Sequence, residues 1–309
     1  MSKLSALHSN FTMGKIPKSS YISKMHKIHA RLFEYSHYIP TTDIRKIEIK
    51  DELVILTSRK NNIQMVCDPL DERIAPIEIL NFTTYEKEEI DMIISLAPVK
   101  PIIFDIGANI GWYSFTLSKQ IQGSQIHAFE PMPNTYKYLV RNTKLNNLAN
   151  IHLYNFGFSD KIGSFDFYFY PEGSGNASMA HLTSQKKVEK IRCKLKTLDN
   201  FCSQSKILPD FIKCDVEGAE LFVFKGGCRL IQGSTPIIFT EMLRKWSKKF
   251  GYHPNDIISF FQQLDYHCFY ISGNKIKQIK TVDFATVPTN FFFLHKKKHQ
   301  EQIKKFQAK

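Results

Sequence analysis

Residues 104–114, which read FDIGANIGWYS, constrain the fold of this chain more than any other stretch. A short run of apolar, β-branched and aromatic residues stands before them, and a helix-compatible segment begins at Trp112. Strand, glycine turn and helix in this order form the frame of a nucleotide-binding βα unit. Glycine lets the backbone turn sharply and lets a ligand approach closely, so Gly107 and Gly111 predict a ligand site. Asp105, at the end of the strand, is placed to accept a hydrogen bond from that ligand.

Apolar runs alternate with helix-compatible segments through most of the remaining chain. The expected strands are residues 102–106, 125–129, 151–156, 211–215, 237–241, 266–271 and 290–294. The expected helices are residues 110–121, 133–146, 219–231 and 254–263. Such alternation predicts an α/β fold with a mostly parallel, seven-stranded, Rossmann-like sheet covered on both faces. Ligands of such sheets bind at the carboxyl ends of the strands, where the strand order reverses.

One region interrupts the alternation. Residues 164–170 and 190–196 show period-two patterns on either side of a glycine- and serine-rich stretch. This arrangement predicts a β insertion whose loop reaches over the strand ends.

The first part of the chain has a different character. Alternating runs at 47–49, 53–57 and 63–67 predict a small antiparallel sheet, preceded by a helix at 24–33. A further helix is expected at 83–96, with Thr83 or Thr84 as its cap. We therefore expect three parts: a small α+β extension at 1–80, the α/β domain at 81–296, and a basic, solvated tail at 297–309.

The chain is basic, with a formal net charge of +13 over 309 residues. This charge is consistent with a nucleic acid, a membrane surface or an anionic substrate as partner, and equally with a merely solvated surface. The six cysteines show no CxxC pair and no zinc spacing, which indicates a reducing compartment, and we expect a cytoplasmic protein with Cys214 buried. Residues 1–27 lack the apolar region of a signal peptide. No run approaches the roughly 20 apolar residues that span a bilayer.

Three features favour S-adenosylmethionine over a dinucleotide as the ligand of the glycine turn. The turn reads D-x-G-x-x-x-G and lacks the G-x-G-x-x-G pattern that cradles a pyrophosphate. Glu130 ends the second strand, where an acid can hydrogen-bond ribose hydroxyls. Asp215 and Glu217 end the fourth strand at the same edge, and a pair of carboxylates suits a cationic sulfonium better than a phosphate.

Five segments together carry a family resemblance. They are FDIGANIGWYS, HAFEP (127–131), FSDKIG (158–163), TLDNF (197–201) and IKCDVEGAE (212–220). In these segments, over roughly residues 83–294, the chain resembles the FkbM-type methyltransferases, which are class I enzymes dependent on S-adenosylmethionine. The DVEGAE segment together with TLD is the specific part, because the glycine turn alone would fit any class I methyltransferase. The first 80 residues show no resemblance to a known family.

The resemblance implies roles for individual residues. Asp105, Gly107, Asn109 and Gly111 would line the methionine half of the cofactor, and Glu130 would hold the ribose hydroxyls.

At the adenine, the resemblance implies contacts with Phe158, Ser159 and Asp160. Many class I enzymes have an acid where this chain has Gly157, so the adenine contact falls to the backbone or to Asp160. Tyr85 and Glu86 resemble a "YE" element that closes over the cofactor, although they would serve equally well as the start of a capped helix.

The resemblance also points to O-methylation of a hydroxyl on a sugar, a glycan or a small metabolite, which requires a group to take the hydroxyl proton. The candidates are Asp215, Glu217, His181 and Glu241, with Asp215 the first choice. Glu217 could instead cap the following helix, and His181 could be an ordinary surface histidine. A divalent metal held by Asp215 and Glu241 is a less favoured alternative, so no metal is expected.

Two alternatives from other classes are open. The +13 charge and the lysine-rich tail are compatible with an RNA methyltransferase, although the strand-end sequence DVEG differs from the Asn/Asp-Pro-Pro-aromatic element used on exocyclic base amines. A non-catalytic binding protein with the same fold is the other alternative, against which the intact cofactor motifs argue. The acceptor and the oligomeric state are not specified by the sequence.

Overall fold

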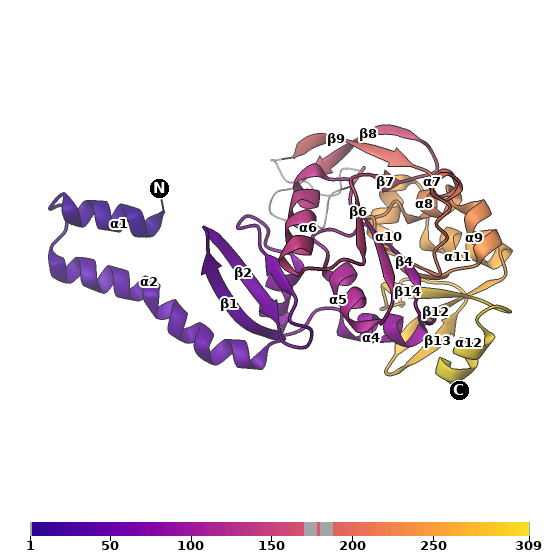
Figure 1. Ribbon diagram of the computed structural model, residues 1–309, viewed down its shortest axis with the longest axis horizontal. Helices are drawn as coiled ribbons and strands as arrows, with labels where there is room; N and C mark the ends of the chain where they lie inside the picture. The colour runs from indigo at the N-terminus through magenta and orange to yellow at the C-terminus, as the bar shows by residue number, and fades with distance from the viewer. Residues whose placement is uncertain (1, 170–177, 180–187, 309) are drawn as a thin grey trace.

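An eight-stranded sheet forms the centre of the α/β part of the chain in the computed structural model, which describes residues 2–169, 178–179 and 188–308 (Figure 1). Five parallel strands occupy one side in the order β11, β10, β4, β5, β6, with bounds Ile237–Glu241, Phe211–Cys214, Ile102–Ile106, Gln125–Phe129 and Ile151–Tyr154. Beyond β11, neighbours pair antiparallel in the order β14 (Asn290–His295), β12 (Tyr266–Ser272), β13 (Lys275–Ile279).

The prediction of a mostly parallel α/β sheet is confirmed, and all seven expected strands are present. The predicted strand number is wrong by one, because β13 adds an eighth strand at the edge. This strand reads KIKQI, and three of its five residues are polar, so its sequence resembles a loop. A short turn through Gly273, which has a φ of +63°, folds β13 back onto β12.

Alternate residues of the strands supply two cores on opposite faces of the sheet. One core contains Ile103 and Phe211, with side chains from α4 (Lys87–Leu96), α5 (Trp112–Gln120) and α6 (Pro133–Leu145). The opposite core contains Phe104 and Ile212, with side chains from α7 (Leu198–Ser205), α8 (Glu220–Lys225), α9 (Cys228–Ser234) and α11 (Pro254–Gln263). Cys214 lies in this second core and is fully buried, as predicted, and all six cysteines are free.

The helix expected at 219–231 is in fact two helices, α8 and α9, which meet at Gly226 and Gly227. Gly226 packs directly on the carbonyl of Ser159, and an added Cβ there would lie 2.1 Å from that oxygen. This contact leaves no room for a side chain at the junction of the two helices.

The helix expected at 83–96 begins later than predicted. A preceding helix, α3 (Ala75–Phe82), ends at Thr83, which adopts a left-handed conformation with φ +70°. Helix α4 starts only at Lys87, after Glu86 at φ +45°, and no side chain caps it. The capping role expected of Thr83 or Thr84 is therefore wrong, and Tyr85 lies in a tight turn between two helices.

The N-terminal sheet is antiparallel, as expected, and consists of β1 (Ile44–Lys50), β2 (Leu53–Ser58) and β3 (Gln64–Val66). Asp51 and Glu52 both have positive φ, which matches the tight two-residue turns of β-hairpins. Two helices precede the sheet: α1 (Lys3–Thr12) and α2 (Lys18–Tyr38), the latter longer than the helix expected at 24–33. A short 3-10 turn, η1 (Ile39–Thr41), joins α2 to β1.

The β insertion pairs β8 (Gly163–Phe169) antiparallel with β9 (Glu189–Lys196), and β9 also pairs with β7 (Gly157–Phe158). The expected β insertion is thus confirmed, whereas most of the loop expected to reach over the strand ends lies outside the described residues. Within the stretch between them, Ser178 forms two backbone hydrogen bonds with Tyr168. The Ser178 hydroxyl also donates to the carbonyl oxygen of Glu217 at 3.0 Å, which joins the insertion to the segment after β10.

The C-terminal tail is folded, contrary to expectation. It forms α12 (Gln300–Phe306), whose Ile303 and Phe306 pack against the core, and the Ala308 N–H donates to the Ile276 carbonyl at 2.9 Å. Lysines dominate the charge of this segment, but an apolar stripe beneath them anchors it. Among the residues described, no helix combines the length and the apolar character needed to cross a bilayer.

Candidate active site

The strand order reverses between β4 and β10, and a cavity of about 400 Å³ opens at the carboxyl ends of these strands. We call this cavity the cleft. Its lining comes from the turn before α4, the β4–α5 turn, the ends of β5, β10 and β11, the β insertion, and α10 (Arg244–Ser247). The predicted location of the ligand site at the strand ends is therefore matched by a cavity.

The glycine turn forms one wall of the cleft and is fixed against its neighbours. Gly107 has φ +76°, and an added Cβ would lie 1.9 Å from the carbonyl oxygen of Asp215. Gly111 has φ +103°, and an added Cβ would lie 2.3 Å from the ring of Phe115. Both positions therefore require glycine, for conformation and for space. Gly107 and Asn109 line the cleft, whereas Gly111 lies beneath it at the start of α5.

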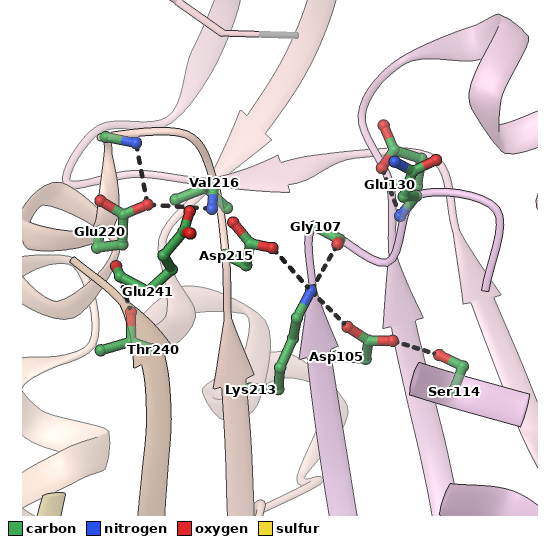
Figure 2. Close-up of polar contacts among 12 residues, drawn as sticks. Asp105, Gly107, Ser114, Glu130, Lys213, Asp215, Val216, Glu220, Thr240 and Glu241 are labelled. Carbon is green, nitrogen blue, oxygen red and sulfur yellow. Dashed lines mark hydrogen bonds and ion pairs between the residues drawn. The ribbon is translucent and has the colours of Figure 1, made fainter. Parts of the chain in front are cut away.

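Glu130 lies at the end of β5, where the sequence placed it, and lines the cleft. Its two carboxylate oxygens accept the N–H groups of Asn109 and Met132, each at 2.9 Å. Figure 2 shows Glu130 on the far side of Gly107 from Glu220 and Glu241. Burial raises the pKa of Glu130 to about 7, although these two hydrogen bonds oppose the shift. Each oxygen has a second lone pair with which it can accept a hydrogen bond from a hydroxyl group.

Asp105 does not reach the cleft. Its side chain is fully buried, and one oxygen accepts the Ser114 hydroxyl at 2.6 Å. The other oxygen lies 3.2 Å from the ammonium of Lys213. Asp105 therefore lies behind the cleft wall, and a direct contact with the ligand, as the sequence suggested, is not what its position favours.

Lys213 is the residue that sequence reasoning missed. It pairs with Asp105 in the register of the parallel strands β10 and β4, so both side chains lie on the same face of the sheet. Its ammonium donates to the Gly107 carbonyl at 2.8 Å and lies 3.8 Å from Asp215 (Figure 2). Burial disfavours the charge, but Asp105 and Asp215 outweigh burial and hold the pKa of Lys213 above its usual value. A lysine inside an otherwise apolar strand, FIKC, is the signal that could have revealed it.

Acidic side chains gather on the opposite wall of the cleft. The pairing of Cys214 with Thr240 places Asp215 and Glu241 side by side at the ends of β10 and β11. Burial, helped by the charge of Asp215, raises the pKa of Glu241 to about 9. Burial also raises the pKa of Glu86 to about 7, although the neighbouring Tyr113 hydroxyl lowers it. These carboxyl groups therefore tend to hold protons.

Glu217 faces the cleft from the turn after β10. Burial, together with the charges of Asp215 and Glu241, raises its pKa well above the usual value. Its Oε2 atom is buried and has no hydrogen-bond partner among the described residues. Glu217 does not cap the following helix, which has no side-chain cap. The turn before that helix is instead held by Glu220, which accepts the N–H groups of Val216 and Gly218 at 3.1 and 3.0 Å.

The other predicted site residues divide into two groups. Tyr85 and Phe158 line the cleft, and Phe158 is buried against the rings of Phe129, Phe156 and Phe201. Ser159 and Asp160 do not line it: the Ser159 N–H donates to Lys196, and Asp160 is exposed. His181 lies outside the described residues. Within those residues no group of three or more potential metal ligands comes together.

Comparison with known proteins identifies the domain that contains this cleft. A family model described as "Methyltransferase FkbM domain" matches residues 105–268. The chain belongs to the FkbM methyltransferase family. Its cofactor is accordingly S-adenosylmethionine, and the resemblance noted in the sequence is confirmed.

Three curated relatives of the FkbM domain show similarity at moderate identity. Methyltransferase 1 of Beauveria bassiana is 29% identical over 147 residues, which cover 42% of this chain and 59% of that protein. Methyltransferase sdnD of Sordaria araneosa is 31% identical over 158 residues, covering 42% and 61%. Hexuronic acid methyltransferase AglP of Haloferax volcanii is 25% identical over 154 residues, covering 50% and 61%. The chain thus spans about three fifths of the length of these relatives.

Proposed function

We propose that this protein transfers a methyl group from S-adenosylmethionine to a hydroxyl of a sugar, a glycan or a small metabolite. The observation that carries the proposal is the pairing of two features in one cleft: the glycine turn with Glu130 on one wall, and the carboxyl cluster on the other. The hexuronic acid methyltransferase among the relatives supports a carbohydrate acceptor.

The cleft fits the proposed cofactor in size and chemistry. Its volume of about 400 Å³ falls within the range of small-molecule sites. We assign the ribose hydroxyls to Glu130 and the adenine to the apolar region around Phe158 and Leu195. We assign the methionine half of the cofactor to the part of the cleft that Gly107 and Asn109 line.

The number of carboxyl groups in the cleft also suits a cationic ligand, because a bound positive charge favours the ionised form of a nearby carboxyl group. The lining contains five acids (Glu86, Glu130, Asp215, Glu217 and Glu241) and three basic residues (Arg73, Lys213 and Lys245). The ammonium of Lys213 is already engaged by Asp105 and the Gly107 carbonyl. The sulfonium and α-amino groups of the cofactor would therefore meet an excess of carboxyl groups.

When bound, the cofactor supplies a methyl group on a positively charged sulfur. A nucleophile that attacks the methyl carbon in line with the carbon–sulfur bond would displace the neutral thioether. The protein must then orient the acceptor hydroxyl, exclude water and take the hydroxyl proton. Asp215, the first choice from sequence, is already engaged by the Lys213 ammonium at 3.8 Å. We therefore propose Glu217 as the proton acceptor, because its buried Oε2 has no partner among the described residues.

Glu241, which lies beside Asp215, is the second candidate for this role. A positive charge bound beside Glu217 and Glu241 lowers their pKa values and so converts protonated acids into bases. In this arrangement the base becomes available when the cleft is loaded.

Calorimetric titration with S-adenosylmethionine tests the cofactor site. The unmodified protein should bind it, and Glu130→Ala should weaken binding at least about tenfold, since a lost hydrogen bond to a charged group is worth about 1.5–3 kcal/mol. Glu301→Ala, an exposed acid on α12, is the matched control and should bind normally. Absence of binding by the unmodified protein would refute the proposal.

Methyl transfer itself can be followed with labelled cofactor over lysate fractions separated into glycan, small-molecule, RNA and protein pools. Label should enter the glycan or small-molecule pool and be lost with Glu217→Gln. Label in the RNA pool would favour the RNA methyltransferase alternative. Cofactor binding without transfer to any pool would favour a binding protein.

A further inference from the structure

The first two helices form a hairpin that stands apart from the rest of the molecule (Figure 1). Helices α1 and α2, every residue of which is described, contain no buried residue. They hold to each other through Phe11 and Tyr21, whose rings stack with centroids 4.4 Å apart. The base of the hairpin is tied to the body by the Tyr38 hydroxyl, which donates to the Leu80 carbonyl. The hairpin is therefore an ordered projection rather than a part of the core.

An apolar face runs along α2. Tyr21, Met25, Ile28, Leu32 and Tyr35 recur at alternating spacings of four and three residues, which places them on one side of a helix. The more C-terminal members are uncovered: Leu32 is 62% exposed and Tyr35 is 43% exposed.

Two further large side chains widen this apolar face. Phe33 is 65% exposed and Ile22 is 55% exposed. On a helical projection both lie about 80–100° around the helix from Leu32, on the side away from the basic residues of α2. Exposed apolar side chains grouped on one helix mark an interaction site.

The hairpin is strongly basic. Residues 2–38 contain one acid, Glu34, and six basic residues: Lys3, Lys15, Lys18, Lys24, Lys27 and Arg31. The acid is paired with Arg31 at 2.7 Å. Lys24, Lys27 and Arg31 flank the apolar face along one side of α2, at helical positions next to Ile28 and Tyr35. Apolar and cationic groups thus share one surface.

We propose that the α1–α2 hairpin docks the protein on an anionic membrane surface, with Leu32 and Phe33 entering the headgroup region and Lys24, Lys27 and Arg31 contacting anionic lipid. Helices that lie in the membrane interface combine an apolar face with basic flanks. Each basic residue near an anionic bilayer adds to the attraction. This inference is independent of the chemistry in the cleft.

Charge decides between this partner and two others. A second copy of the hairpin would bring one cluster of six basic residues against another, so self-association is disfavoured. A nucleic acid would engage the lysines but would leave Leu32, Phe33 and Ile22 exposed to water. An anionic bilayer satisfies both the charged and the apolar groups.

Co-sedimentation of the full chain with lipid vesicles tests the proposal. The protein should bind vesicles of equimolar phosphatidylcholine and phosphatidylglycerol, and bind vesicles of phosphatidylcholine alone at least about tenfold more weakly. Leu32→Ser/Phe33→Ser should lower binding to the anionic vesicles at least about tenfold. The matched control is Leu208→Ser/Phe82→Ser, which removes residues of the same types that are 54% and 67% exposed outside the hairpin. That control should bind like the unmodified protein.

A second variant separates charge from apolar contact. Lys24→Ser/Lys27→Ser/Arg31→Ser should lose binding to the anionic vesicles, and salt should weaken the binding of the unmodified protein. Equal binding to neutral and anionic vesicles, or equal loss in the control, would overturn the proposal. Binding to RNA without binding to vesicles would also overturn it. So would the formation of a dimer that Leu32→Ser/Phe33→Ser dissociates, if the protein does not bind vesicles.

Discussion

The buried pair of Lys213 and Asp105 connects the stability of the sheet to the shape of the cleft. The same ammonium holds the Gly107 carbonyl, so this one side chain fixes the glycine turn against β10. Removing one partner of a buried ion pair leaves an uncompensated charge and costs about 3–5 kcal/mol. Lys213→Met should therefore lower the free energy of unfolding by about 3 kcal/mol, as measured by urea denaturation.

The pair can be tested with a double-mutant cycle. Lys213→Met/Asp105→Asn removes both charges and should recover a substantial part of the loss, because no buried charge is left unpaired. Lys245→Met, an exposed lysine near the cleft, serves as the control and should change the stability little. If the losses caused by Lys213→Met and Asp105→Asn simply added in the double variant, Lys213 and Asp105 would not act as a pair.

Glu241 predicts a dependence of stability on pH. Burial raises its pKa from 4.5 to about 9, so the folded protein retains a proton that the unfolded chain releases. An acid with a raised pKa makes folding less favourable as the pH rises from about 4.5 towards 9. Glu241→Gln removes this dependence and should raise the free energy of unfolding by about 2 kcal/mol at pH 8, but far less at pH 5.

Urea denaturation at both pH values measures the effect, with the exposed Glu301→Gln as control. An equal gain in the free energy of unfolding at pH 5 and pH 8 would show that the effect arises from packing and not from titration of Glu241. A gain confined to pH 8 would show that the cleft retains its carboxyl cluster at the expense of stability, as functional sites commonly do.

Sequence reasoning found some site residues and missed others for a physical reason. Gly107 and Glu130 follow from local rules, because a βα turn needs a conformation that only glycine adopts readily and the acid ends the next strand. The pairing of Lys213 with Asp105 depends on the register between β10 and β4, which lie more than 100 residues apart in the chain. No local pattern encodes that register. Asp105 was therefore expected to face the cleft, whereas it lies behind the cleft wall and is paired with Lys213.

At the scale of secondary-structure elements, Gly226 predicts a contrast between two glycines. A Cβ at Gly226 would lie 2.1 Å from the Ser159 carbonyl oxygen, whereas a Cβ at Gly233 in α9 would meet no atom within 4 Å. Gly226→Ala should therefore destabilise the protein by about 1–3 kcal/mol, as overpacking does. Gly233→Ala should stabilise it by up to about 1 kcal/mol, because alanine favours the helix.

Thermal unfolding of both variants measures this difference, and the two substitutions are chemically identical. If Gly226→Ala is as stable as the unmodified protein, the α8–α9 junction does not rest on Ser159. The same contact would then fail to explain why the predicted helix at 219–231 is broken.

Most elements of the α/β part could be predicted, because strands and helices there carry clear patterns of their own. The departures occur where tertiary contacts override a local pattern. The region 219–231 continues an apolar helical pattern through Gly226 and Gly227, where the chain packs closely against Ser159 and Leu198. In α12 the lysines conceal Ile303 and Phe306, which are anchored by a core whose position cannot be known from the sequence alone.

At the scale of the whole molecule, the net charge of +13 conceals an uneven distribution. Acids outnumber basic residues in the cleft, while the projecting hairpin is almost entirely basic. The two surfaces therefore differ in their chemistry: carboxyl groups gather in the cleft, and ammonium and guanidinium groups gather on the hairpin. The net charge of the whole chain does not reveal where the basic residues lie. For this reason the composition alone was compatible with a nucleic acid, a membrane or an anionic substrate as partner.

The two ends of the chain differ in what they contribute to the fold, and truncation should separate them. Helices α1 and α2 bury no residue, so a chain that begins at Ile39 should unfold within about 1 kcal/mol of the full chain and bind S-adenosylmethionine equally well. A chain that ends at Lys298 loses the buried His299 and the packing of Ile303 and Phe306, and should lose about 2 kcal/mol. Urea denaturation and calorimetric titration measure both properties. If removing the hairpin cost as much as removing α12, the hairpin would belong to the folded core and could not serve as a free docking surface.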